Sequence, residues 1–178
     1  MPRLRFNFLN LFLIGLVALI LCGLQTTFWF QIFGGLPAPL FWLNLVLYLV
    51  LFRKHFESIL TIYFVALILH SFTALPLGIL LFSLLIIFGL VSFVKKRVFW
   101  PGSKYFFMAS LGASVTFHLL CYFLSRWLDV NPTSFNFFQR FFEIVFTAIS
   151  SVPLYWAFSW IDRFSNKKTL PESAGAHG

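Results

Sequence analysis

Charge is the scarcest property of this sequence. Charged residues make up 10 % of its 178 residues, and only five of them are Asp or Glu. Soluble globular chains carry roughly 25 % charged residues. Apolar residues reach 60 % and the mean hydropathy is +0.91, so a water-soluble domain of this length could not bury its apolar surface. The composition therefore predicts a membrane protein that forms a single domain.

Cysteine and the common catalytic patterns are also scarce. Both cysteines, Cys22 and Cys121, fall inside apolar runs, which argues against a disulfide framework or a metal site. The sequence contains no Gly-rich phosphate loop, no His-x-x-x-His pair and no Cys-x-x-Cys pair. We therefore expect the protein to have no enzymatic activity, no cofactor and no metal ion.

Long apolar runs separated by short breaks fill the rest of the sequence. A membrane-spanning helix needs about 20 apolar residues, with a range of about 17–25. The runs predict an all-α polytopic protein with six transmembrane helices, at residues 8–28, 36–52, 56–72, 76–94, 104–128 and 137–161. These helices form one predicted domain over residues 1–164. Residues 165–178 are polar and small and contain a proline, which is typical of a disordered tail.

The positions of Lys and Arg predict the orientation of the helices. The breaks between the runs alternate between basic and poor in Lys and Arg. Eleven of the 13 Lys and Arg residues fall on one predicted side, and only Arg126 and Arg140 fall on the other. Because cytoplasmic loops are rich in Lys and Arg, we expect both termini in the cytoplasm and the helices in an inner membrane. The net charge of +8 then indicates topology and contact with anionic lipid head groups, and no nucleic-acid partner is expected.

Few ionisable side chains fall within the predicted helices, and these are the candidate functional residues. They are His70, His118, Arg140 and Glu143, all in the outer half of the predicted bundle. Arg140 and Glu143 are three residues apart, so they can pair on one helix face. Two interpretations stay open. Either the pair neutralises itself while each His bonds a neighbouring helix, or the four residues form a buried polar cluster that handles a proton or a substrate.

Small residues form two ridges that can serve helix packing. One ridge is on the first predicted helix and the other is on the fifth. Their members are Gly15, Ala18 and Cys22, and Ala109, Ala113 and Thr116. Ridges of small residues let helix backbones approach closely in lipid. Packing within the bundle and docking of a partner helix are both consistent with them.

The order of these features resembles a known family of membrane proteins. After the first helix come a Pro-containing outer break, a second helix with a basic end, a Pro-Leu-Gly stretch, a basic loop and a Trp-containing closing helix. The matching segments are Gly34-Gly35-Leu36-Pro37, Arg53-Lys54, Ala74-Leu75-Pro76-Leu77-Gly78, Lys95-Lys96-Arg97 and Trp160-Ile161-Asp162-Arg163. Over residues 8–164 the chain resembles the MreD family of rod shape-determining proteins, as a divergent member. His70-Ser71 stands where that family commonly has an acidic residue and a glycine.

The resemblance implies a non-enzymatic partner protein of bacterial cell-wall elongation. Members of the family are thought to act through helix–helix contacts with a periplasmic-domain partner, MreC, and with the peptidoglycan synthase machinery. Their six-helix fold is similar to the substrate-binding components of energy-coupling-factor vitamin transporters. This similarity supplies an alternative function, the binding of a small solute. It requires an outer pocket with converging polar groups, for which Asn136 joins His70, His118 and Glu143 as a candidate.

Overall fold

The computed structural model describes residues 8–73, 75–97, 102–128 and 136–164, and every regular element within them is helical. The elements are α1 (Phe8–Gly23), η1 (Leu24–Phe28), α2 (Trp29–Phe33), α3 (Phe41–Phe52), α4 (His55–His70), α5 (Leu77–Arg97), α6 (Ser103–Leu128) and α7 (Phe137–Phe164). The π-helical turn η1 joins α1 to α2. The predicted tail at residues 165–178 lies outside the described residues.

The chain is an all-helical, multi-pass membrane protein. Among the described residues, four helical segments are long and apolar enough to cross a bilayer: Phe12–Phe33, Leu77–Arg97, Ser103–Leu128 and Phe137–Arg163. Helices α3 and α4 are apolar too but shorter. Large apolar side chains, including Phe82, Phe93, Phe123 and Trp160, point away from the bundle and are more than half exposed. So extensive an apolar surface is suited to lipid rather than to water.

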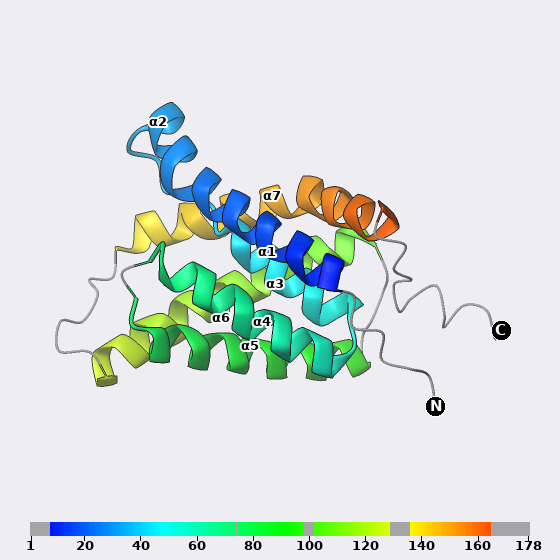
Figure 1. The fold of residues 1–178 in the computed structure, drawn as a ribbon. Coiled ribbons are helices and arrows are strands. Elements are labelled where there is room, and N and C mark those ends of the chain that lie inside the picture. The colour runs from blue at the N-terminus through cyan, green and yellow to red at the C-terminus, as the bar shows by residue number, and fades with distance from the viewer. Residues whose placement is uncertain (1–7, 74, 98–101, 129–135, 165–178) are drawn as a thin grey trace.

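The helices lie side by side in a bundle, and successive segments run in opposite directions (Figure 1). Helix α1 begins at the same end of the bundle as α7 finishes, and α2 projects at the opposite end (Figure 1). Helix α6 packs most extensively against α7, and α1 packs against α3 and α4.

Helix α3 lies at the centre of the bundle. It contacts α1, α4, α5, α6 and α7, and all of its residues after Phe41 are buried. A helix that is apolar on every side is buried on every side. Its 12 residues span about 18 Å, which is short of the roughly 30 Å of a bilayer's hydrocarbon core. Protein rather than lipid surrounds α3, so its length does not have to match the membrane.

The segment before α3 is not helical, although the sequence predicts a helix from residue 36. Pro37 and Pro39 explain the difference, because proline lacks an N–H and disfavours a helical conformation in the residue before it. The N–H of Leu40 instead donates a 2.8 Å hydrogen bond to Oγ1 of Thr147 on α7. Irregular backbone at membrane depth is tolerated where protein groups supply such partners.

Side chains from neighbouring helices donate hydrogen bonds to backbone carbonyl groups at the other end of α3. The carbonyl of Leu49 accepts a 2.7 Å hydrogen bond from Oγ of Ser58. The carbonyl of Val50 accepts a 3.1 Å bond from Nζ of Lys95. The carbonyl of Leu49 also accepts the backbone N–H of Arg53 at 3.1 Å, whereas the bond from Lys95 supplies a partner to a carbonyl in the last turn of α3, where intrahelical donors run out.

Several helices are longer than their apolar runs predict. The first, predicted to end at residue 28, continues through α2 to Gly34, where a φ of 57° stops it. Helix α5 continues through Lys95, Lys96 and Arg97, beyond the predicted end at residue 94. Basic side chains are favourable in the last turn of a helix, because the helix dipole is negative there. Hydropathy measures only the apolar part of such a helix and therefore underestimates its length.

Candidate functional site

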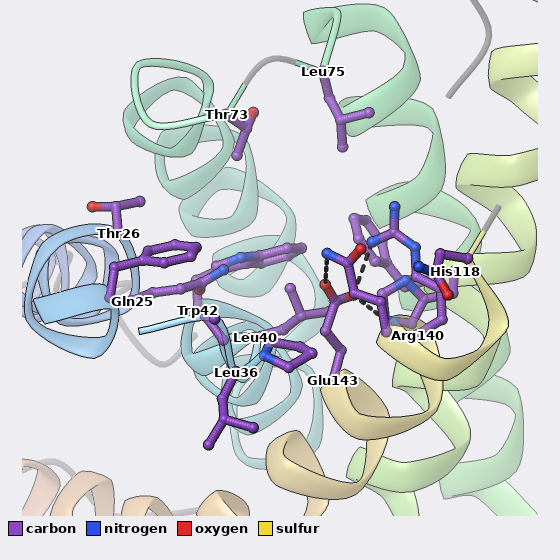
Figure 2. A pocket seen from close by; sticks show the side chains of 17 residues that line it. Gln25, Thr26, Leu36, Leu40, Trp42, Thr73, Leu75, His118, Arg140 and Glu143 are labelled. Atoms are coloured by element: carbon purple, nitrogen blue, oxygen red, sulfur yellow. Dashed lines mark hydrogen bonds and ion pairs between the residues drawn. The ribbon is translucent and has the colours of Figure 1, made fainter. Parts of the chain in front are cut away.

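A cavity of about 460 Å³ opens beside the irregular segment that precedes α3 (Figure 2). Its wall comes from the η1 and α2 region, from the start of α3, from Thr73 and Leu75 between α4 and α5, and from α6 and α7. Gln25 and Thr26 lie on the opposite side of the cavity from His118, Arg140 and Glu143 (Figure 2). The full lining is Gln25, Thr26, Phe30, Gly35, Leu36, Pro37, Ala38, Leu40, Trp42, Thr73, Leu75, Phe117, His118, Asn136, Gln139, Arg140 and Glu143.

Glu143 is the centre of the charged part of the wall. Arg140, one turn earlier on α7, donates from Nη1 to Oε2 of Glu143 at 2.8 Å. Gln139 donates from Nε2 to Oε1 of Glu143 at 3.2 Å. Nε2 of His118 on α6 lies 3.3 Å from Oε2 of Glu143, but its alignment is not that of a hydrogen bond. Glu143 is 7 % exposed, and burying a carboxylate is costly unless such partners compensate it.

Three of the four residues predicted to form a polar cluster meet here, and the fourth does not. His118, Arg140 and Glu143 all line the cavity. His70 is exposed at the end of α4 and does not line it, so its predicted membership of the cluster is wrong. The lengths of the apolar runs predict how deep a residue lies in the membrane. They do not predict toward which neighbouring helix its side chain points. Asn136, the additional candidate for solute binding, does line the cavity.

A second polar network, which the sequence did not predict, adjoins this site. Asn44 on α3 is fully buried and donates from Nδ2 to the carbonyl of Thr147 at 3.1 Å and to Oγ of Ser150 at 3.3 Å. Oδ1 of Asn44 accepts a 2.6 Å bond from Oγ of Ser110 on α6. The hydroxyl of Thr147 donates to the carbonyl of Glu143 at 2.5 Å. A lone Asn within the apolar run at residues 41–52 was the signal that could have revealed this network.

A third polar group lies at the other end of α3. Nη2 of Arg53 donates to Oδ1 of Asp162 on α7, and both side chains are about 95 % buried. Oη of Tyr48 donates to Oδ2 of the same carboxylate at 2.7 Å. The sequence places Arg53 and Asp162 at the ends of apolar runs, where charged residues usually face water. Only the packing of α3 against α7 makes them a buried ion pair.

The two predicted ridges have different surroundings. Gly15, Ala18 and Cys22 on α1 face the inside of the bundle. A Cβ atom on Gly15 would lie 2.8 Å from the ring of Phe64 on α4. Ala18 and Cys22 are at most 1 % exposed. This ridge therefore serves packing within the bundle.

The ridge on α6 borders an open groove instead. A groove of about 380 Å³ runs between α5 and α6 and is lined by Ile87, Leu90, Val91, Val94, Tyr105, Met108, Ala109, Gly112, Ala113 and Thr116. Its walls are almost entirely apolar, and the small residues of α6 form part of its lining. A Cβ atom on Gly112 would meet no other atom within 4 Å. This part of α6 is accessible to another apolar chain.

No recognisable metal or redox site is present in the part of the chain that the structure describes. No three His, Cys, Asp or Glu side chains gather closely enough to hold a metal ion there. Cys22 and Cys121 are both free and buried. No family model, curated protein or solved structure matches the chain. Its function must therefore be inferred from its own residues.

Proposed function

We propose that the chain is a six-span protein of the bacterial inner membrane that acts, without catalysing a reaction, as a partner of the cell-wall elongation machinery. Its partners are an MreC-like membrane protein and the peptidoglycan synthase machinery. The observation that carries the proposal is the apolar groove between α5 and α6. The order of motifs that resembles MreD supplies the identity of the machinery.

The proposed topology places both termini in the cytoplasm. It is supported by the common end at which α1 begins and α7 finishes, and by the basic residues of that end, such as Lys95, Arg97 and Lys104 (Figure 1). After residues 54, 97 and 178, only a fused reporter that functions in the cytoplasm should be active. After residues 35 and 72, only a fused reporter that functions in the periplasm should be active. The opposite pattern at either outer position would contradict six spans.

The groove favours contact with another transmembrane helix. Lipid tails are as apolar as helix surfaces, so association in a membrane depends on close packing, which small residues permit. Ala109, Gly112 and Ala113 provide such a surface, with Leu90 and Val94 on the α5 side. A partner helix that enters the groove would pack against α6 at short range.

Filling the groove tests this proposal. Gly112→Leu adds a side chain at an exposed position whose Cβ atom would meet no other atom within 4 Å, so the bundle should still fold. The added side chain should exclude the partner, and a loss of about 1.4 kcal/mol in contact energy weakens binding about tenfold. The measurement is recovery of elongation proteins with the chain from solubilised membranes, together with cell shape.

Gly89→Leu is the matched control. Gly89 is an exposed α5 residue that does not line the groove, and its Cβ position is equally open. Gly89→Leu should leave both the recovery of elongation proteins and the cell shape unchanged. If the unaltered chain recovers no elongation protein and its depletion leaves cell shape normal, the proposal fails. If the variants at Gly112 and Gly89 behave alike, the groove is not the contact surface.

The cavity favours a second candidate, the solute-binding component of a vitamin-type transporter. Its volume falls within the roughly 300–1,000 Å³ of small-molecule sites, and its wall combines aromatic and polar side chains. His118→Ala and Glu143→Gln should then impair growth on a limiting vitamin. Purified protein should carry a small molecule. Unchanged growth together with an empty purified protein would rule this candidate out.

A further inference from the structure

Several residues that line the cavity carry buried polar atoms without a hydrogen-bond partner in the protein. Within the described chain, seven buried side-chain nitrogen and oxygen atoms have no hydrogen-bond partner, and four of them belong to residues that line this cavity. The four are Oε1 of Gln25, Nε1 of Trp42, Oγ1 of Thr73 and Nε2 of His118. Leaving such an atom unsatisfied costs about 1–3 kcal/mol. Their concentration at one place indicates a site built to bind a polar molecule.

The chemistry of these atoms specifies what the molecule must offer. The indole N–H of Trp42 can only donate a hydrogen bond, and the carbonyl oxygen of Gln25 can only accept one. The hydroxyl of Thr73 and the imidazole of His118 can do either. Trp42 is 2 % exposed and His118 is 6 % exposed, so bulk water does not solvate them freely. The bound molecule must therefore carry both an acceptor and a donor.

The charges of the wall exclude an ion as the preferred occupant. Arg140 and Glu143 are the lining residues with a fixed charge, and they pair with each other at 2.8 Å. Their charges cancel, so neither an anion nor a cation would find an uncompensated opposite charge. Drawing Arg140 away to bind an anion would leave the buried carboxylate of Glu143 without its cation, which is costly.

The remaining wall is apolar and partly aromatic. The rings of Trp42 and Phe117 meet edge to face with their centroids 5.0 Å apart. Phe30, Leu36 and Leu75 add further apolar surface. We propose that the cavity binds a small, uncharged ring compound that carries an amide-type donor and acceptor. The inference uses the cavity of the second candidate function, but it does not require that the compound be transported.

Matched fragments test the proposal on the full chain in lipid nanodiscs. Nicotinamide and benzamide carry the required amide, whereas nicotinate and benzoate have the same rings with a charged carboxylate. Ligand-detected NMR measures their affinities, and the indole N–H resonance of Trp42 reports on the site. The amides should bind at least about tenfold more tightly than the acids and should shift that resonance.

Two variants in different elements of the wall, α3 for Trp42 and η1 for Gln25, locate the binding. Trp42→Phe keeps an aromatic ring but removes the donor, and Gln25→Met removes the acceptor. Each should weaken amide binding about three- to tenfold, the range expected for one lost hydrogen bond. Trp156→Phe is the control, since Trp156 is an exposed α7 residue that does not line the cavity.

Three results would overturn the inference. The first is acids binding as tightly as the amides. The second is amide affinity that neither Trp42→Phe nor Gln25→Met changes. The third is no binding of either amide, which would leave water as the occupant of the cavity. None of these results bears on recovery of elongation proteins or on growth with a limiting vitamin, so this inference and the proposed functions can fail separately.

Discussion

The buried ion pair between Arg53 and Asp162 makes a quantitative prediction about stability. Both side chains are about 95 % buried, and the carboxylate also accepts the hydroxyl of Tyr48. Arg53→Met leaves the Asp162 carboxylate buried without its cation. Removing one partner of a buried pair costs about 3–5 kcal/mol, so the folding equilibrium should fall by a factor between about 100 and several thousand.

Substituting the partner residue, Asp162, should cost less stability than substituting Arg53. The difference follows from the shapes of the two side chains. In Asp162→Asn the long stem of Arg53 can carry its charge toward the lipid head groups, whereas a short Asp side chain cannot move as far. The residue at position 162 can also still accept the hydroxyl of Tyr48. We expect a loss of about 1–3 kcal/mol, the cost of a disrupted buried hydrogen bond.

The double variant distinguishes pairing from simple loss of packing. Arg53→Met with Asp162→Asn removes both charges, and buried pairs replaced by neutral groups often lose little stability. It should therefore be more stable than Arg53→Met alone by at least about 1 kcal/mol. The assay is unfolding of the purified chain by SDS in mixed micelles, followed by tryptophan fluorescence. If the two single losses add up in the double variant, the pair has no coupling and the reasoning is refuted.

Three further predictions use the same unfolding assay. Asn44→Leu should lose about 1–3 kcal/mol, because its partners on α6 and α7 stay buried without it; no loss would mean that those partners re-pair. Gly15→Leu should lose about 1–3 kcal/mol by overpacking α1 against α4, whereas Gly23→Leu, with open space at its Cβ, should not; equal effects would contradict this packing. Lys95→Met should lose about 1–2 kcal/mol with its bond to the carbonyl of Val50, and an unchanged stability would show that the bond contributes nothing.

The sequence predicts the helical content well because helices in lipid are long apolar runs. It could not predict that α3 is enclosed by other helices. Lipid and a protein core are equally apolar, so the run at residues 41–52 is consistent with either environment. The start of α3 was also misplaced, since hydropathy treats the Pro37–Pro39 segment as part of the run although its backbone cannot be helical. These differences come from backbone chemistry and tertiary packing, which an apolar count does not contain.

The candidate site was predictable where it depends on one helix and unpredictable where it depends on several. The spacing of Arg140 and Glu143 predicts their pairing, because both residues lie on α7. His118 joins them only because α6 packs against α7 with that face inward. His70 was placed at a similar depth, but its face of α4 points elsewhere. The rotation of each helix about its axis decided these outcomes, and the weakly amphipathic sequence carries little information about it.

The polar bonds of α3 also constrain how the chain is made. Asn44 bonds to Thr147, which is 103 residues later, and Arg53 pairs with Asp162, which is 109 residues later. At a synthesis rate of about 5–20 residues per second, α3 emerges from the ribosome about 5–20 s before these partners exist. During that interval the membrane insertion machinery must shelter a short helix that carries an unpaired arginine and asparagine. A chain interrupted before α7 would keep the bond of Asn44 to Ser110 on α6 but would lack the carboxylate that pairs with Arg53, which makes the last helix a checkpoint for quality control.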